Sequence, residues 1–355
     1  MTVSVVLIAK NQDWNSRRLI ESILQGNGSY ELLDVILVDS ASSDSTIEFA
    51  QEYPIDVLRL RPDQILTPAA GRYVGYKRAR GEFILFVDGD MELCHGWLGD
   101  ALSMMQTDCT VGVATGQIVD VSPGETKPRV ENVERSGCKN VSYCGGAALY
   151  RRSVLESVGV FNPYLYSEEE PELCLRIRHA GYRIVELQRT VVFHYSTPTS
   201  AFGTLVARWR RNLYLGAGQN IRYLLGTPLL WLYLKERGWG CVPALTIAAG
   251  LACFAWSVVT SQWTWFASWL LLMATVFLAD SYRKRSFYLA LRSVFRRVLM
   301  ADGTVRGLLL RPMDPNTYPA RFDIIKSCSL ANSRVLTVTP AAGVERRQHG
   351  ARRDP

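Results

Sequence analysis

The sequence contains, at residues 83–90, the stretch FILFVDGD: a β-branched and aromatic run that stops at two aspartates separated by one glycine. Such a run is typical of a buried strand, and a buried strand holds the side chains at its end in a fixed direction. The glycine lets another group approach the backbone, and two hard carboxylate ligands leave room around Mg²⁺ or Mn²⁺ for phosphate oxygens. We therefore expect Asp88 and Asp90 to hold a divalent metal. The alternative is an ordinary polar turn after a strand.

The first ninety residues alternate between strand-like and helix-like segments. Val3–Ala9 is a short valine-rich run, residues 15–25 carry their apolar side chains on one helical face, and Leu32–Val38 is again strand-like. A helical pattern over Thr46–Tyr53 and a short strand over Ile55–Leu60 follow. This alternation predicts an α/β fold with an open, mainly parallel sheet flanked by helices.

Two aspartates mark the edge of this sheet where a ligand is expected. In open parallel sheets, ligands bind at the carboxyl ends of the strands. Asp39 follows one predicted strand and Asp88 follows another. Both side chains are therefore expected on the same rim of the sheet.

Several segments, within roughly the first 195 residues, resemble motifs of the family 2 glycosyltransferases with the GT-A fold. They are the opening strand with its polar Asn11, the segment DSASSD at 39–44, the segment PAAGRYVG at 68–75, and the aspartates described above. Ala41 stands where the family has glycine, and Tyr73 stands where it has asparagine. The resemblance implies that Asp39 contacts the nucleotide base and Arg72 the diphosphate. The donor nucleotide would be bound by Ala9, Asn11, Asp39, Arg72, Asp88 and Gly89.

The second half of the resemblance concerns the donor sugar and the acceptor. Residues 143–152, YCGGAALYRR, resemble a strand beneath the donor sugar, where Gly145 and Gly146 would let substrate touch the backbone. Residues 168–176, EEEPELCLR, are similar to the family motif Glu-Asp-x-Asp-Leu-x-x-Arg and put Glu170 at the catalytic base. Three consecutive glutamates leave Glu169 as the base if the register slips, and Glu169 is otherwise expected beside the sugar. The structural alternative is an acidic first turn of a helix.

Inverting sugar transfer explains why these residue types are needed. The acceptor hydroxyl loses its proton as it attacks the anomeric carbon, so a carboxylate serves as general base. The departing nucleoside diphosphate develops negative charge, which a bound Mn²⁺ or Mg²⁺ stabilises. In the family, a histidine on the strand after the base helix can complete the metal site. That position is His194, beside the ligands Asp88 and Asp90, and a structural histidine is the alternative.

An apolar region follows the part that carries these motifs. Residues 238–279 contain no Asp, Glu, Lys or Arg over 42 positions. One helix of that length would measure about 63 Å, roughly twice the hydrocarbon thickness of a bilayer. We therefore expect a transmembrane hairpin, with helices near Val242–Thr260 and Thr264–Leu278 and with tryptophans gathered towards the turn. The alternative is a hairpin buried in a soluble core.

Basic residues flank the apolar region. Six arginines and lysines lie between Arg208 and Arg237, and residues 281–311 hold eight basic residues against one acidic residue, Asp302. Both flanks are therefore expected to be cytoplasmic and to contact anionic membrane lipid. The net charge of +7 is attributed to lipid, since no nucleic-acid recognition motif is present. The first predicted strand begins at the start of the sequence without the pattern of a signal peptide. The sequence has no Cys-x-x-Cys pair, so a zinc ribbon is not expected.

The sequence thus predicts a GT-A catalytic domain followed by membrane-associated segments. The expected parts are the catalytic domain (1–197), basic amphipathic interfacial helices (198–237), a transmembrane hairpin (238–280), a basic membrane-proximal segment (281–339) and a disordered tail (340–355). The protein is expected in the inner or plasma membrane, as a multi-pass protein whose catalytic domain is cytoplasmic.

The predicted activity is metal-dependent, inverting transfer of a sugar from a nucleoside diphosphate to a hydroxyl. The acceptor is expected to be a lipid-linked or growing glycan, in polysaccharide or glycolipid synthesis. The family resemblance makes UDP the preferred nucleotide, since aspartate can accept a hydrogen bond from the uracil imide, although guanine also presents donors. Two alternatives remain open. One is a polyprenyl-phosphate glycosyltransferase, whose anionic acceptor needs no general base, and the other is a non-catalytic nucleotide-binding scaffold of a synthase complex.

Overall fold

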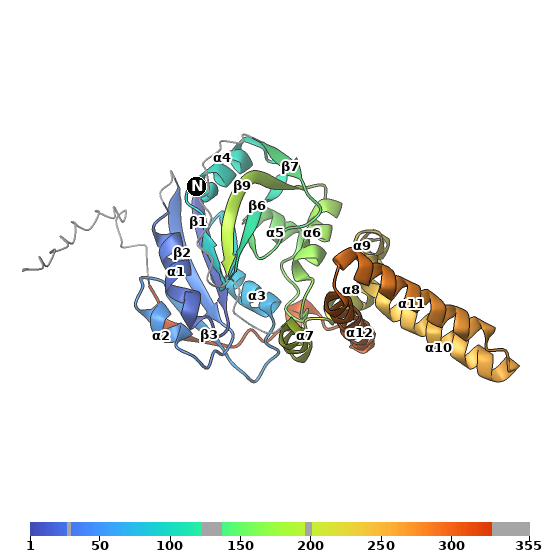
Figure 1. Ribbon diagram of the computed structural model, residues 1–355. Helices are drawn as coiled ribbons and strands as arrows, with labels where there is room; N and C mark the ends of the chain where they lie inside the picture. The colour runs from blue at the N-terminus through green and yellow to red at the C-terminus, as the bar shows by residue number, and fades with distance from the viewer. Residues whose placement is uncertain (27–29, 123–136, 196–200, 329–355) are drawn as a thin grey trace, which may run out of the picture.

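The computed structural model of the 355-residue chain describes residues 1–26, 30–122, 137–195 and 201–328 (Figure 1). The catalytic part contains β1 (Thr2–Ala9), α1 (Asp13–Leu24), β2 (Glu31–Asp39), α2 (Thr46–Gln51), β3 (Asp56–Leu60), α3 (Pro68–Arg78), β4 (Phe83–Asp88), β5 (Met91–Leu93), α4 (Trp97–Thr107), β6 (Val111–Val121), β7 (Cys138–Asn140), β8 (Ala147–Arg151), α5 (Arg152–Val158), α6 (Glu169–His179) and β9 (Arg183–Tyr195). It is followed by α7 (Ala201–Arg210), α8 (Gly216–Leu224), α9 (Leu229–Arg237), η1 (Gly238–Cys241), α10 (Val242–Thr260), α11 (Thr264–Lys284), α12 (Phe287–Leu309), η2 (Pro315–Thr317) and β10 (Phe322–Lys326). The tail predicted over 340–355 lies outside the described residues.

One mixed sheet runs through the catalytic part, in the order β10-β3-β2-β1-β4-β8-β6-β9-β5, with β7 beside β9. Strands β3, β2, β1 and β4 are parallel, as the alternation in the first ninety residues predicts. Beyond β4 the sheet continues with the antiparallel strand β8, and β6 then pairs antiparallel to β8 and parallel to β9. The predicted α/β class is confirmed. Asp39 and Asp88 both belong to the parallel half of the sheet.

Helices cover both faces of this sheet (Figure 1). In β1, the side chains of Val5 and Leu7 pack in the core layer that includes α1, α2 and α4, whereas Val6 and Ile8 pack in the layer of α3, α5 and α6. A strand that is buried on both faces is apolar at every position. This is why β1 appears in the sequence as an almost continuous apolar run, in which the buried Ser4 hydrogen-bonds to Asp34.

Strand register brings the predicted aspartates to one rim. Ala9 at the end of β1 pairs with Asp39 on β2, and Ile8 pairs with Asp88 on β4. The two aspartates therefore end the two strands that flank β1. Their expected placement on one edge of the sheet is confirmed.

Strand β10 corrects the expected domain boundaries. Residues 281–339 were expected to lie outside the catalytic domain, but Phe322–Lys326 pairs antiparallel with β3 and extends the sheet. Ion pairs of 2.7 Å join Arg61 to Asp323 and Arg321 to Asp63 on the same edge. Strand β10 has only five residues, and its partner lies more than 250 positions earlier in the chain. The residues around β10 therefore give no sign in the sequence that this segment joins the sheet, because the pairing depends on the partner strand.

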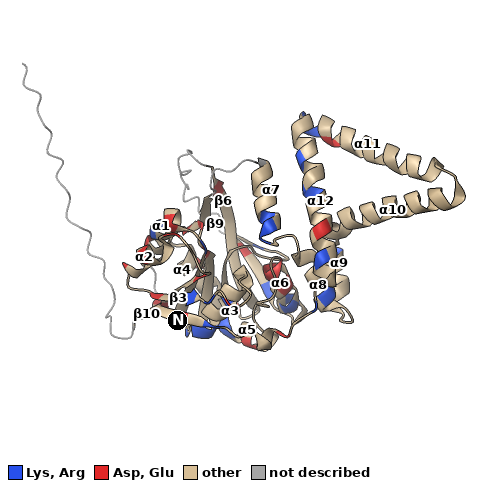
Figure 2. Ribbon diagram, turned by 90° about the horizontal axis from the view of Figure 1, so that it is seen from below, with Lys and Arg blue, Asp and Glu red and all other residues tan. Residues whose placement is uncertain are grey.

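The helices after β9 gather on one side of the catalytic domain, and the pair α10–α11 projects away from them (Figures 1 and 2). Helix α9 is tied to α6 by two ion pairs, Arg178–Glu236 at 2.6 Å and Arg237–Glu168. Lysines and arginines colour α7, α8, α9 and α12, while α10 and most of α11 carry none (Figure 2). The basic segments thus form the base from which the apolar hairpin extends.

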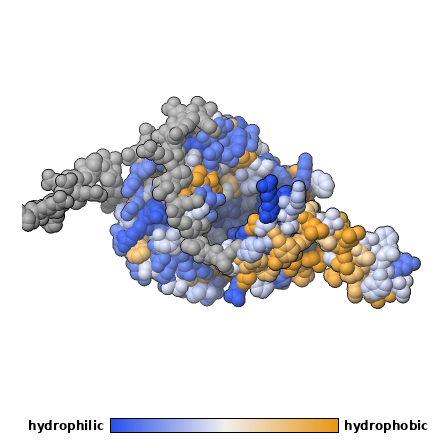
Figure 3. All heavy atoms as spheres, in the orientation of Figure 1, coloured by the Kyte–Doolittle hydropathy of each residue, from blue (hydrophilic) through white to orange (hydrophobic). Residues whose placement is uncertain are grey.

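Two helical segments, Leu229–Thr260 and Thr264–Lys284, are long and apolar enough to cross a membrane. The rest of the described chain does not cover them, since Leu251, Val259 and Leu271 are 65%, 81% and 69% exposed. Figure 3 shows hydrophobic residues gathered along the hairpin, in contrast with the hydrophilic catalytic domain. The described part of the chain therefore does not bury the hairpin, as the soluble-core alternative requires. Helix α10 has the predicted bounds, and α11 extends beyond the predicted Leu278 to Lys284.

Helix α3 lies close to the sheet because it carries two glycines. A Cβ built at Gly71 would lie 2.9 Å from Cγ2 of Ile8, and one built at Gly75 would overlap the side chain of Val6. Neither position has room for a methyl group. The two glycines therefore set the distance between α3 and β1, and with it the position of Arg72 between them.

Replacing Gly75 by alanine should lower the free energy of unfolding by about 1–3 kcal/mol, the usual cost of forcing extra atoms into a packed core. Chemical unfolding of the detergent-solubilised protein, followed by circular dichroism, measures the change. Gly99→Ala is the matched control, because nothing lies within 4 Å of a Cβ at that position of α4. A Gly75→Ala protein as stable as the control would contradict the close approach.

Candidate active site

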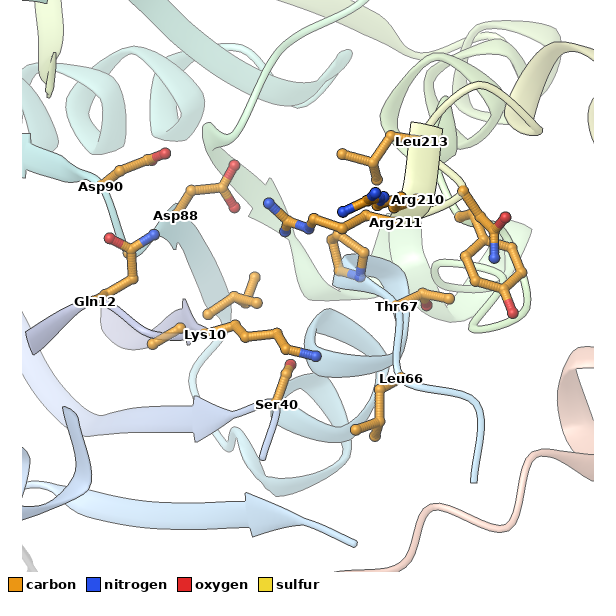
Figure 4. A pocket seen from close by; sticks show the side chains of 16 residues that line it. Lys10, Gln12, Ser40, Leu66, Thr67, Asp88, Asp90, Arg210, Arg211 and Leu213 are labelled. Atoms are coloured by element: carbon orange, nitrogen blue, oxygen red, sulfur yellow. The ribbon is translucent and has the colours of Figure 1, made fainter. Parts of the chain in front are cut away.

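A cavity of about 410 Å³ opens at the carboxyl ends of β1, β2 and β4 (Figure 4). Its lining comes from the strand ends, from the start of α3 and from segments around α6 and α7: Ile8, Ala9, Lys10, Gln12, Ser40, Leu66, Thr67, Pro68, Asp88, Gly89, Asp90, Tyr166, Arg210, Arg211, Asn212 and Leu213. Of the residues predicted to form the site, Ala9, Asp88, Gly89 and Asp90 line this cavity.

The cavity has an acidic wall and a basic wall. In Figure 4, Asp88 and Asp90 lie on one side and Arg210 and Arg211 on the other, with Lys10 reaching in from the end of β1. Within the described parts of the chain, none of these three cationic side chains has an ion-pair partner. The arrangement is complementary to a ligand that carries anionic groups next to a bound cation.

Arg210 and Arg211 were not predicted as site residues. In the sequence they belong to a basic stretch with Trp209, which is expected to contact lipid headgroups. Helix α7 instead ends beside the cavity, about 120 residues after the Asp88 strand. The signal available in the sequence was the pair of adjacent arginines followed by an asparagine, a residue type common in turns. In the structure the backbone of Asn212 has a φ of +61°. Such a left-handed asparagine marks a tight turn.

Arg72 does not line the cavity, although it was predicted to contact the diphosphate. Its side chain is 2% exposed, and its guanidinium forms ion pairs of 2.7 Å with three carboxylates, those of Asp88, Glu169 and Glu170. It also lies over the ring of Phe161, 5.5 Å from the centroid. The guanidinium therefore joins α3, the end of β4 and the first turn of α6.

This cluster contains more carboxyl groups than its single cation neutralises. Burial raises the pKa of Glu169 to about 8, and the charge of Glu170 adds to the rise while Arg72 opposes it. Burial likewise raises the pKa of Asp88 to about 7, again against the effect of Arg72. A carboxyl group that is desolvated and adjacent to like charges holds its proton. At neutral pH the cluster therefore retains protons that ordinary carboxylates would have lost.

The two candidate bases differ in exposure. The side chain of Glu170 is 15% exposed and that of Glu169 is 5% exposed. Glu170 contacts Nη2 of Arg72, which also contacts Asp88, whereas Glu169 contacts Nη1. Both residues lie in the acidic first turn of α6, as the structural alternative predicted, and this position is compatible with a chemical role.

Asp39 and Asn11 organise the loop after β2 and do not line the cavity. The carboxylate of Asp39 accepts a hydrogen bond from the backbone N–H of Ser42 at 2.9 Å, and Oδ1 of Asn11 accepts one from the N–H of Ser43 at 2.9 Å. Oδ1 of Asp39 is buried and has no partner among the described residues, and burial raises its pKa. Ala41, in the place of a family glycine, has a φ of +57°, a conformation that favours glycine.

The glycines of the site make room for other groups. A Cβ at Gly146 would overlap Oδ2 of Asp88, so this glycine leaves space for the carboxylate that Arg72 holds. A Cβ at Gly89 would lie 2.8 Å from Cγ of Gln12 and 2.9 Å from the carbonyl oxygen of Ile8. Gly145 has more space, with Cδ1 of Ile118 at 3.2 Å. Gly89 and Gly146 are thus explained by the packing around Asp88.

His194 lies beside Asp90, because the strands β5 and β9 pair next to the β4 turn. Its Nε2 is 3.4 Å from Oδ2 of Asp90, and its Nδ1 is 2.6 Å from Oδ1 of Asp120. The hydrogen bond to Asp90, with that to Asp120, raises the pKa of His194 to about 9. In the described part of the chain no three His, Cys, Asp or Glu side chains form a complete metal site. Asp90 and His194 supply an oxygen and a nitrogen donor side by side, a pair that suits Mn²⁺.

Comparison with solved structures shows similar folds. The mannosyltransferase PcManGT from Pyrobaculum calidifontis, in complex with GDP-Man and Mn²⁺, has a TM-score of 0.55 at 17% identity, and the match covers 86% of this chain and 86% of that one. TarS 1–349 of Staphylococcus aureus, in complex with UDP-GlcNAc, has a TM-score of 0.50 at 17% identity and covers 81% of this chain and 93% of that one. At these identities the likeness concerns the fold.

Sequence comparison identifies the family. The pre-mycofactocin glycosyltransferase of Mycobacterium tuberculosis (strain CDC 1551 / Oshkosh) is 31% identical over 197 residues, which cover 51% of this chain and 40% of that protein. The match thus spans about two fifths of the length of that relative. Residues 4–159, which include β1 to α5 and the cavity-lining aspartates, match the model of glycosyl transferase family 2. The chain therefore carries a glycosyl transferase family 2 domain, built on the GT-A fold.

Proposed function

We propose that the protein is a membrane-anchored, metal-dependent, inverting glycosyltransferase. It transfers a sugar from a nucleoside diphosphate to a hydroxyl of a lipid-linked or growing glycan. The observation that carries this proposal is the cavity at the strand ends, where Asp88 and Asp90 face Lys10, Arg210 and Arg211. Support comes from the relative described as a glycosyltransferase and from the similar folds solved with GDP-Man and with UDP-GlcNAc.

In this proposal the donor diphosphate is bound by the basic wall of the cavity. Lys10, Arg210 and Arg211 are free of ion pairs within the described chain and can donate hydrogen bonds to phosphate oxygens. The nucleotide base lies towards Asp39, whose Oδ1 is buried without a partner among the described residues. Such an acceptor fits an imide N–H, so UDP is the proposed nucleotide. Ala9 and Gly89 line the cavity between the two, and Asn11 supports the loop after β2 that carries Asp39 at its start.

The proposed metal ligands are Asp90 and His194, and Asp88 completes the acidic wall beside them. The Nδ1 atom of His194 bonds to Asp120, the outer contact that usually fixes a metal-binding imidazole. Mn²⁺ or Mg²⁺ bound there would neutralise the charge of the departing diphosphate. A hard cation with few protein ligands takes its remaining ligands from phosphate and water.

The proposed general base is Glu170. Its carboxylate accepts the proton of the acceptor hydroxyl as that oxygen attacks the anomeric carbon from the side opposite the diphosphate, which inverts the configuration. Glu169, whose side chain is 5% exposed against 15% for Glu170, is less accessible to an acceptor hydroxyl. Gly146 makes room for the carboxylate of Asp88, and Gly145, which precedes it in the chain, is the proposed contact of the donor sugar with the backbone.

Arg72 positions the catalytic groups instead of binding the diphosphate. It is buried and already shared among three carboxylates, so it has no donor directed into the cavity. By holding Asp88 and Glu170 on the same Nη2 atom, it fixes the distance between the acidic wall and the base.

The hairpin α10–α11 is proposed to span the membrane, with the catalytic domain in the cytoplasm. Both helices are apolar and uncovered, and basic residues flank them on both sides. Both basic flanks lie at the same end of the hairpin. Because basic loops tend to stay in the cytoplasm, this end of the hairpin and the catalytic domain are placed on the cytoplasmic side. Anchoring in the inner or plasma membrane suits synthesis of a glycolipid or polysaccharide from cytosolic nucleotide sugars.

Two alternatives make different demands on the site. A polyprenyl-phosphate glycosyltransferase needs no general base, so it gives no role to the glutamate that Arg72 holds. A non-catalytic scaffold would need the nucleotide cavity but not the α6 carboxylates. Glu170 beside Asp88 favours the hydroxyl acceptor over both.

Binding of UDP and GDP to the detergent-purified protein, measured by calorimetry with Mn²⁺ and with EDTA, tests the donor site. One nucleotide should bind with Mn²⁺ and lose at least tenfold in affinity with EDTA, and Asp90→Asn should cause the same loss. Asp100→Asn, an exposed position on α4, should behave as the unmodified protein. Binding that is indifferent to both EDTA and Asp90→Asn would refute the metal site.

Glu170→Gln should reduce transfer by about 10²–10⁴-fold, because the attacking hydroxyl then keeps its proton. The nucleotide affinity should stay within twofold. Incorporation of radiolabelled sugar into membrane extracts measures transfer. Glu169→Gln is the matched control, since it makes the same change at the neighbouring, more buried position, and it should keep most of the activity. The reverse result would make Glu169 the base.

Arg72→Leu should destabilise the protein by about 3–5 kcal/mol, because it leaves buried carboxyl groups without their cation. The loss should be greater at pH 8.5 than at pH 5, since the raised pKa values of Asp88 and Glu169 keep both groups neutral in the folded state at the lower pH. Thermal unfolding at the two pH values measures it. Arg211→Leu, the control, should weaken nucleotide binding without this loss of stability. A stable Arg72→Leu protein that fails to bind nucleotide would restore the diphosphate role of Arg72.

A further inference from the structure

A second cavity, of about 390 Å³, lies beside the donor cavity and shares Tyr166 and Asn212 with it. One wall comes from the catalytic domain through Ile65 and Tyr164. The opposite wall comes from α8 and from the end of α12 and the residues after it. The cavity therefore runs between the donor site and the helices at the base of the hairpin.

The lining of this cavity is mainly aromatic and aliphatic. It includes the rings of Tyr164, Tyr166 and Tyr223, and we refer to the whole as the tyrosine cleft. Its polar groups are largely used within the protein, since Gln219 bonds to the backbone of Tyr164 and Tyr166, and the Tyr223 hydroxyl bonds to the backbone of Met313. The surface left for a ligand is thus apolar.

The charge of the tyrosine cleft is positive. Arg306 and Arg311 line it, and none of its described lining residues is acidic. Arg306 is paired with Asp302 at 2.8 Å and lies over the ring of Trp209. Arg311 is exposed and, among the described residues, has no ion-pair partner. An anion at the end of α12 would find this guanidinium available for a bidentate contact.

The tyrosine cleft opens at the face of the protein that is expected to contact lipid. Along α12, large apolar side chains recur at helical spacing and are exposed: Phe287, Leu291, Val294, Val298, Val305 and Leu309. An uncovered apolar stripe on a basic helix is typical of a helix lying in the membrane interface. The stripe ends at Leu309, which is 80% exposed and lines the cleft.

We propose that the tyrosine cleft binds the carrier lipid of the acceptor: a lipid with a phosphate or diphosphate headgroup, whose anion contacts Arg311. The chain of the lipid lies against the tyrosines and Leu309, and the sugar that it carries extends past Tyr166 and Asn212 into the donor cavity. This inference rests on the proposed function and specifies the class of acceptor. It follows from the continuity of the two cavities together with the apolar, cationic lining of the second.

Titration of the full-length, detergent-purified protein with farnesyl phosphate tests this proposal. EDTA is present throughout, so that metal-dependent binding in the donor cavity does not contribute. Farnesyl phosphate should bind at least tenfold more tightly than farnesol, which lacks the anion, or inorganic phosphate, which lacks the chain. Arg311→Gln and Leu309→Glu should each weaken binding at least tenfold, because one removes the cation and the other adds a negative charge at the opening.

Arg296→Gln is the matched control, since Arg296 is an exposed arginine on α12 outside the cleft lining. It should leave farnesyl phosphate binding unchanged, and all three variants should bind nucleotide with Mn²⁺ normally. Equal affinities for farnesol and farnesyl phosphate, or equal effects of Arg311→Gln and Arg296→Gln, would overturn the assignment. If nucleotide binds with Mn²⁺ and farnesyl phosphate does not, the cleft assignment fails and the proposed function stands. If nucleotide itself does not bind, the proposed function fails.

Discussion

One buried guanidinium, that of Arg72, joins three elements that are far apart in the sequence. It is placed by two glycines that bring α3 against β1, and it contacts the carboxylates of Asp88 at the end of β4 and of Glu169 and Glu170 on α6. A cation desolvated in this way is stable only while its partners surround it. The same contact therefore maintains the core and sets the geometry of the site. Gly146 belongs to this arrangement, because a side chain there would displace the carboxylate of Asp88.

The arrangement around Arg72 also connects the catalytic domain to the helices beyond it. Helix α6 carries the carboxylates on its first turn, and ion pairs of Glu168 with Arg237 and of Arg178 with Glu236 hold α9 against it. Helix α9 leads directly into α10 and the apolar hairpin. These ion pairs fix the distance between the donor cavity and the base of the hairpin. A sugar acceptor carried by a membrane lipid would reach the donor sugar only if this distance is kept.

The polarity of the donor cavity arises from residues contributed by distant parts of the chain. Its acidic wall belongs to the strand ends, whereas two of its three cationic side chains come from the end of α7. Neither wall alone would bind a nucleoside diphosphate sugar with its metal. The site is complete only when the helices after β9 are docked, and these are the helices that also line the tyrosine cleft. In the proposed function, donor binding and acceptor binding therefore depend on one interface.

The sequence alone determined the parallel half of the sheet, the rim that holds Asp39 and Asp88, and the bounds of α10, because each follows from local periodicity. Strand β1 is apolar from Val5 to Ala9 since it is buried on both faces, and α10 is uncharged and leaves large apolar side chains exposed among the described residues. Only the tertiary structure decided the position of β10, the burial of Arg72 and the presence of Arg210 and Arg211 in the cavity. A motif reports which residue occurs but not which way its side chain points. That direction is set by packing partners up to hundreds of residues away, as the glycines beneath α3 and the pairing of β10 with β3 demonstrate.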